Sequence, residues 1–123
     1  MASELGSNTA AQLRNRCNDV DTTDYADAAL DVIITKHEHL VYVKLARATS
    51  SPYTTADDVF EVVNLAILES AACEVYGGID NTKDQKDAAC KYAEELIQAI
   101  KGAPTSGGGA SGKLGKTQGF NNR

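Results

Sequence analysis

Apolar residues recur at helical spacing in four segments of the chain, and this pattern predicts an all-α fold, a small bundle of about four helices. The first segment runs from about Thr9 to Cys17, with one face formed by Ala10, Leu13 and Cys17. The second continues to about Ala48, and its apolar face holds Leu30, Ile33, Ile34, His37, Val41, Leu45 and Ala48. The β-branched clusters at 32–34 and 41–43 would also suit a strand, but the helical period favours a helix.

The third and fourth segments carry the two most regular apolar stripes. The third is the predicted central helix of the core, with a face formed by Val59, Val62, Val63, Ala66, Ile67, Ser70 and Cys73. The fourth has a single stripe formed by Ala89, Tyr92, Ala93, Leu96, Ile97 and Ile100. Because these stripes keep an unbroken helical face, we expect the two helices to form the core.

Polar turns set the expected limits of the second helix. It follows the turn at 18–23, with Thr23 or Asp24 as its N-cap and Asp27 in its first turn, where the helix dipole favours a carboxylate. Residues 49–53 break the helical pattern because they contain a proline, which disfavours helix at its own and the preceding position.

Capping signals set the limits of the last two helices. Two residue pairs have capping-box spacing at the expected starts of these helices: Thr55 with Asp58, and Thr82 with Gln85. The third helix is expected to end at Gly77 or Gly78, because either glycine can take the left-handed conformation of a helix C-cap. The fourth is expected to stop at Gly102, just before Pro104.

Charge and glycine content divide the chain into three parts. Residues 1–8 are expected to be a flexible N-terminus, 9–102 the helical bundle, and 103–123 an extended Gly-rich, basic C-terminal arm. The arm has six of the ten glycines and no acidic residue. The preceding 102 residues, the body, carry all seventeen carboxylates against nine of the twelve Lys and Arg, a net charge of −8, whereas the arm carries +3. This asymmetry indicates docking onto a neighbouring subunit rather than turnover of a substrate.

The overall composition excludes several classes of protein. The net charge of −5, without clustered Lys or Arg on the body, argues against sequence-independent binding of nucleic acid. No apolar run is long enough to span a membrane, and the N-terminus lacks the layout of a signal peptide, so we expect a soluble protein made in a cytoplasm. The odd number of cysteines without CxxC spacing predicts reduced thiols, with two of them as small core residues: Cys73 and Cys90.

No motif in the sequence completes a catalytic, cofactor or metal site. The run Gly107–Lys113 matches the phosphate-binding pattern GxxxxGK, but Leu114 replaces the required Ser or Thr and no strand precedes the run. His37 and His39 lie two apart on a helix, so we expect one in the core and one in solvent. The aspartates before and within the second helix lack EF-hand spacing and are interpreted as a solvated helix start or a negative surface for a partner: Asp19, Asp21, Asp24, Asp27 and Asp31. The sequence therefore predicts a non-enzymatic protein with no cofactor and no metal.

Three runs within residues 13–102 resemble the small head-to-tail connector (adaptor) proteins of tailed phages and related viruses: LRNRCNDVDTTDYADAALDVIITKHEHL, SPYTTADDVFEVVNLAILESAACEVYG and KDAACKYAEELIQAIKG. In that family an Asp-rich turn precedes an AL..II helix, a DD…V..A helix follows, and a Y..A..LI..I..G helix closes the bundle. The matching residues here are Ala29, Leu30, Ile33, Ile34, Asp57, Asp58, Val62, Ala66, Tyr92, Ala93, Leu96, Ile97, Ile100 and Gly102.

The resemblance implies a virion structural protein of the neck region, made in the host cytoplasm. Its expected partners are other copies of itself in a ring, commonly twelve-fold, the portal protein above and tail or neck proteins below, with DNA only as passing cargo and no membrane. The arm is expected to grip an adjacent subunit or the portal through five residues: Lys113, Leu114, Lys116, Phe120 and Arg123. The alternative is a soluble cellular helical protein-interaction module with a disordered tail.

Overall fold

Four α-helices form the part of the chain that the computed structural model describes, residues 5–103. In chain order the helices are α1 (Ala10–Arg16), α2 (Asp27–Lys44), α3 (Phe60–Gly77) and α4 (Lys83–Lys101). No strand occurs between residues 5 and 103, so the predicted all-α class with about four helices is confirmed. The expected C-terminal arm lies outside the described residues except for Ala103.

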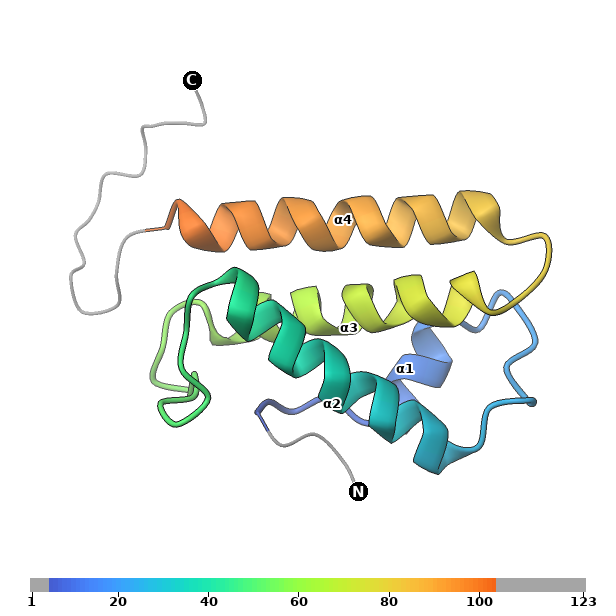
Figure 1. Cartoon of the computed structure of the whole chain (residues 1–123), viewed down its shortest axis with the longest axis horizontal. Helices are drawn as coiled ribbons and strands as arrows, with labels where there is room; N and C mark the ends of the chain where they lie inside the picture. Colours follow the sequence, from blue (N-terminus) through green and yellow to red (C-terminus); the bar gives the residue numbers. More distant parts are fainter. Residues whose placement is uncertain (1–4, 104–123) are drawn as a thin grey trace.

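Helix α3 lies at the centre of the fold. It runs side by side with α4 in the opposite direction, α2 crosses it obliquely, and α1 packs against both α2 and α3 (Figure 1). Its buried apolar residues lie around much of its circumference: Val63, Ala66, Ile67, Ala71, Ala72, Val75 and Tyr76. The prediction of a central core helix is therefore correct, although Val59 and Val62 near its start are only partly buried.

Helix α4 buries one stripe, as its amphipathic pattern predicts. The buried residues are Ala89, Ala93, Ile97 and Ile100, and Leu96 is partly buried beside them. Tyr92 was expected on this stripe but is 43% exposed, because it precedes Ala93 by one residue, a step of about 100° around the helix. The helix ends at Lys101 with Gly102 as its C-cap, as predicted.

Helix α1 begins with a capping box. The hydroxyl of Thr9 accepts a hydrogen bond from the backbone N–H of Gln12 at 3.2 Å, and the Gln12 side chain accepts one from the Thr9 N–H at 2.8 Å. This arrangement satisfies two of the N–H groups that the first turn of a helix leaves without a partner. The predicted helix at about Thr9 to Cys17 is confirmed, and its predicted face is buried: Ala10, Leu13 and Cys17.

Helix α2 begins later than the sequence pattern predicts. Its N-cap is Ala26, in place of the two predicted caps, Thr23 and Asp24. The physical reason is a tether from α1: the Arg14 guanidinium donates to the backbone carbonyl of Tyr25 at 3.0 Å and to the carboxylate of Asp27 at 2.6 Å. The Arg14 side chain keeps the preceding turn non-helical as far as Ala26. The helix therefore begins at Asp27, which lies in its first turn as predicted.

The end of α2 also differs from the prediction, which placed it near Ala48. The helix stops at Lys44 because Ala46 takes a left-handed conformation, with φ 56°. The N–H of Arg47 then donates to the carbonyl of Tyr42 at 2.9 Å, the hydrogen bond of a Schellman motif. Glycine is the usual residue at this position. Because the sequence has Ala46 there, the end of the helix could not be recognised from the sequence.

The start of α3 was predicted too early. The helix begins at Phe60, and the expected capping box of Thr55 with Asp58 does not form. Instead, the carboxylate of Asp57 accepts a hydrogen bond from the N–H of Thr54 at 2.7 Å, which stabilises a separate turn before the helix.

Steric contact rather than helix capping explains the glycine after α3. Gly78 is the C-cap but has a φ of −95°, so the predicted left-handed conformation is wrong. A Cβ at this position would collide with the Tyr25 hydroxyl, so a larger residue here would require the Tyr25 side chain to shift. Thr82 is the N-cap of α4, but its hydroxyl donates to the carbonyls of Tyr76 at 2.5 Å and Ile79 at 2.7 Å, and makes no capping box.

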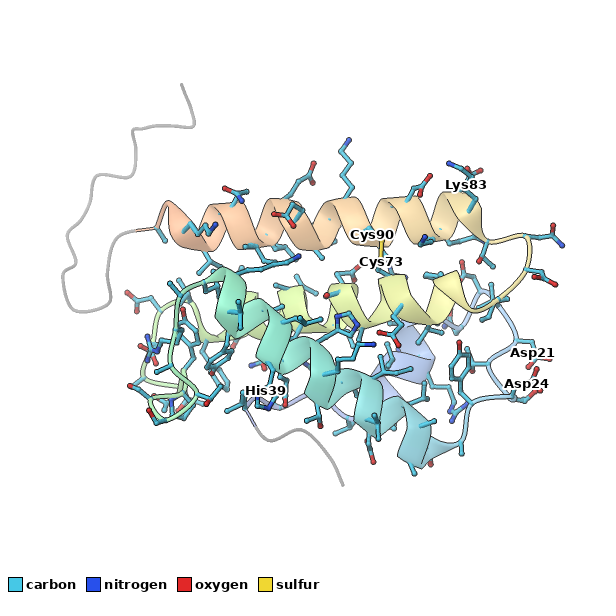
Figure 2. The ribbon with its side chains drawn as sticks, in the orientation of Figure 1. Asp21, Asp24, His39, Cys73, Lys83 and Cys90 are labelled. Carbon is cyan, nitrogen blue, oxygen red and sulfur yellow. A yellow bond between two sulfur atoms is a disulfide. The ribbon has the colours of Figure 1, made fainter. Side chains whose placement is uncertain are left out.

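A disulfide joins α3 to α4 between Cys73 and Cys90 (Figure 2), so the expectation of reduced thiols is wrong for this pair. In an antiparallel pair of helices, residues at similar distances from the connecting turn lie opposite each other, and here the two Cα atoms are 5.0 Å apart. Cys17 is a free, buried thiol, and burial raises its pKa.

Reduction of the disulfide is expected to lower the free energy of unfolding by about 3 kcal/mol, because the bond closes a loop of intermediate length. The two cysteines are 17 residues apart in the sequence. Urea unfolding with and without a dithiol reductant measures the effect. A double variant, Cys73→Ala with Cys90→Ala, serves as the control whose stability the reductant does not change. Equal stability of the oxidised and reduced wild type would contradict the prediction.

Candidate functional site

A pocket of about 300 Å³ lies between α2 and α4, and α3 forms part of its wall. Most of its lining is apolar or sulfur-containing: Leu40, Val41, Cys73, Cys90 and Ala93. Four polar side chains complete the lining: His37, Lys44, Ser70 and Glu94. We call this cavity the α2–α4 pocket. The disulfide fixes α4 to α3 within its wall, so this part of the pocket is held in place covalently.

An ion pair at the edge of the α2–α4 pocket links the two helices. Lys44 Nζ on α2 lies 3.5 Å from Glu94 Oε1 on α4, and both side chains are about half exposed. Exposed pairs of this kind contribute only about 0–1 kcal/mol. Separation of the ion pair therefore costs little free energy when a group enters the pocket between Lys44 and Glu94.

Three side chains form a hydrogen-bonded line beside the pocket. His37 Nδ1 lies 2.6 Å from Ser70 Oγ, and His37 Nε2 lies 2.7 Å from Glu74 Oε1. Lys36 Nζ also lies 2.9 Å from this carboxylate. Partial burial alone would raise the pKa of Glu74, but the hydrogen bonds from Lys36 and His37 outweigh it and hold the pKa below its usual value. As predicted, His37 is buried and His39 is exposed.

This line is not visible in the sequence, because His37 is on α2 whereas Ser70 and Glu74 are on α3. The only local signal is the i, i+4 spacing of Ser70 and Glu74. Serine, histidine and a carboxylate are the groups of a hydrolase triad, which also needs N–H donors for an oxyanion. The backbone N–H groups near Ser70 lie in the middle of α3, where such groups donate along the helix. We therefore interpret the line as a polar link between α2 and α3.

A second polar network fixes α1 to α3. Arg16 makes a bidentate ion pair with the buried Glu69, through Nε at 2.6 Å and Nη2 at 2.8 Å. Arg16 Nη1 also donates to the Tyr76 hydroxyl at 3.2 Å, and that hydroxyl donates to Asp19 at 2.5 Å. The hydrogen bonds that Arg16 donates to Glu69 raise the pKa of Arg16, while burial and the bond to Asp19 raise the pKa of Tyr76. This network is structural, since it fills the contact between two helices.

The aspartates around the start of α2 do not converge on one site. Asp21 and Asp24 lie on the loop before α2 and point away from the helices (Figure 2). Asp27 pairs with Arg14, and Asp19 belongs to the network of Tyr76. Among residues 5–103, no group of three or more His, Cys, Asp or Glu side chains lies close enough together to hold a metal ion.

Helix α2 carries two exposed valines on the side that faces away from the core. Val32 and Val43 are 67% and 76% exposed, and they lie opposite the buried side of the helix, which contains Leu30 and Val41. We call Val32, Lys36, His39 and Val43 the outer face of α2, because their spacing places them on one side. The sequence contains this signal as the two valines at positions 32 and 43, which share one side of the helix.

The five residues predicted to bind a partner, Lys113, Leu114, Lys116, Phe120 and Arg123, lie outside the described residues. Within residues 5–103, no helix combines the length and apolar character needed to cross a membrane. Comparison of the chain with protein-family models, with curated proteins and with solved structures found no match.

Proposed function

We propose that this chain is a non-enzymatic adaptor of a virion neck, which forms a ring with other copies of itself and joins a portal protein to tail or neck proteins. The proposal combines the resemblance to head-to-tail connectors with the surface of the helical body. Its expected location is the virion neck, after synthesis in the host cytoplasm. The basic arm is the segment expected to reach an adjacent subunit or the portal.

The observation that carries the proposal is the outer face of α2. Val32 and Val43 are well exposed although the opposite side of the same helix is already buried against α1 and α3. Single exposed apolar residues are common, but two on one helix face, with Lys36 and His39 between them, are suited to packing against another protein. A ring subunit needs such a surface in addition to its own core.

The negative charge of the body supports the expectation that DNA passes the subunit without binding to it. A body of net −8 repels phosphate, so it lacks the attraction that lets basic proteins hold DNA. A subunit that surrounds a DNA channel benefits from this repulsion, because the passing duplex does not adhere to the wall. DNA is accordingly proposed as cargo and not as a ligand.

Native mass spectrometry and negative-stain electron microscopy of the purified full-length chain test the proposal. We expect closed rings that form across the micromolar range. The variant Val32→Glu with Val43→Glu is expected to prevent ring formation while its circular dichroism stays unchanged, since both positions are exposed. Ser50→Glu, an exposed loop position, is the control for added charge and is expected to leave rings intact.

A chain that stays monomeric at every concentration would contradict the adaptor proposal. That result would favour the alternative, a helical interaction module that binds a different protein. Rings that survive in the Val32→Glu and Val43→Glu variant would show that the ring uses a different surface, and would remove the observation on which the proposal rests.

A further inference from the structure

The α2–α4 pocket and the C-terminal arm have complementary properties. We propose that the pocket binds the Phe120 side chain from the arm of a neighbouring copy of this chain. This inference rests on the proposed function, since it requires that copies of the chain assemble, and it names the contact that would join one subunit to the next.

The lining and the size of the pocket suit a single aromatic side chain. Leu40, Val41 and Ala93 supply an apolar wall, and the volume of about 300 Å³ accommodates a phenyl ring. Beyond residue 103 the sequence has only two large apolar residues, Leu114 and Phe120. Phe120 is the larger of the two and buries more apolar surface on docking.

The cations around Phe120 are opposite in sign to the carboxylates on the α4 side of the pocket, while Lys44 on the α2 side is itself a cation. Lys116 precedes Phe120 by four residues and Arg123 follows it by three, and the arm has no acidic residue. Glu94 is half exposed at the edge of the pocket, and Glu95 follows it on α4. Exposed ion pairs add little affinity but steer association and orientation. The phenyl ring of Phe120 therefore supplies most of the affinity, and the cations guide it to the pocket.

The backbone next to Phe120 can approach the pocket closely. Gly119 precedes it directly and Gly115 lies five residues earlier, and glycine permits close backbone approach that a Cβ would prevent. The link from Gly102 to Phe120 has eighteen residues, which span up to about 60 Å when extended. A domain of this size has a radius of gyration of about 13 Å, so the arm is long enough to reach the next subunit.

The pocket can also admit a side chain without a large rearrangement of its walls. The disulfide holds α4 against α3 at Cys73 and Cys90, both of which line the pocket. On the other side, the exposed ion pair of Lys44 and Glu94 connects α2 to α4 at 3.5 Å. A pocket with one fixed wall and a weakly closed edge loses little conformational freedom on binding.

Photocrosslinking of the full-length chain tests the inference. Phe120 is replaced by p-benzoylphenylalanine, the protein is mixed with ¹⁵N-labelled copies and irradiated, and crosslinked peptides are identified by mass spectrometry. We expect crosslinks between labelled and unlabelled copies, on residues 40–44 of α2 or 90–94 of α4. Because the contact is mainly apolar, the yield is expected to persist at high salt.

Two variants with matched exposure show whether the pocket itself is used. Leu40 and Tyr92 are both 43% exposed, but only Leu40 lines the pocket. Leu40→Glu is expected to reduce the crosslink yield by about tenfold, the effect of losing roughly one order of magnitude in affinity. Tyr92→Glu is expected to leave the yield unchanged. Equal yields in both variants, or an equal loss in both, would overturn the proposal.

Photocrosslinking combined with the test for rings distinguishes a failure of this inference from a failure of the proposed function. Crosslinks between copies in the pocket, without rings, would support the pocket contact and contradict the adaptor. Rings in which the crosslinks fall outside the pocket, or within one chain, would overturn the pocket contact and leave the adaptor supported.

Discussion

Replacement of Glu69 by alanine is expected to lower the free energy of unfolding by about 2–4 kcal/mol, because it removes the buried partner of an ion pair whose other partner, Arg16, is 31% exposed and stays partly hydrated. Glu69 is nearly inaccessible to solvent, and its two carboxylate oxygens both accept hydrogen bonds from Arg16. Without the carboxylate, the guanidinium loses its main partner in the contact between α1 and α3. Urea unfolding followed by circular dichroism measures the change.

Two further variants show whether the charge pair or the packing is responsible. Glu61→Ala removes an exposed carboxylate from the first turn of α3 and is expected to cost less than about 1 kcal/mol. The double variant Arg16→Met with Glu69→Leu is expected to recover much of the lost stability, because apolar residues of similar volume often replace a buried pair without loss. A loss in Glu69→Ala no larger than in Glu61→Ala would refute the prediction.

Truncation of Ile67 to alanine is expected to destabilise the protein by about 2–5 kcal/mol. Ile67 is fully buried on α3, the helix that contacts each of the other three. The truncation removes apolar contacts and leaves a cavity that the disulfide-linked helices α3 and α4 cannot easily close. The midpoint and slope of urea unfolding give the change in stability.

The matched control for Ile67→Ala is Val32→Ala on the outer face of α2. Val32 is also β-branched and helical but is well exposed, so its truncation in the monomer is expected to change stability by less than about 0.5 kcal/mol. Similar unfolding midpoints for the wild type and Ile67→Ala would show that α3 does not form the centre of the core.

The sequence by itself determined the features that depend on residues three or four positions apart. The faces of α1 and α4, the start of α1 near Thr9 and the stop at Gly102 all follow from neighbours within one or two turns of helix. The burial of His37 opposite the exposed His39 follows from the same period. Such patterns are visible in the sequence because a helix brings these positions together wherever it lies in the fold.

Helix starts were less predictable, because several polar residues compete for the same role. At α2, a side chain from another helix decided the outcome: Arg14 binds the turn before Asp27 and excludes the predicted caps. At α3, Asp57 bonded to Thr54 and formed a turn in place of the expected capping box. In both cases a competing hydrogen bond forms in place of the predicted cap.

Only the tertiary structure decided which distant residues meet. Cys73 and Cys90 are 17 residues apart, His37 and Ser70 are 33 apart, and Arg16 and Glu69 are 53 apart. The α2–α4 pocket likewise combines residues from three helices. The periodicity of a helix fixes which side of it is apolar but leaves open its neighbours, its direction and its axial position. The arrangement of the helices is set by how their apolar faces pack against one another, since the burial of apolar surface depends on all of the helices together.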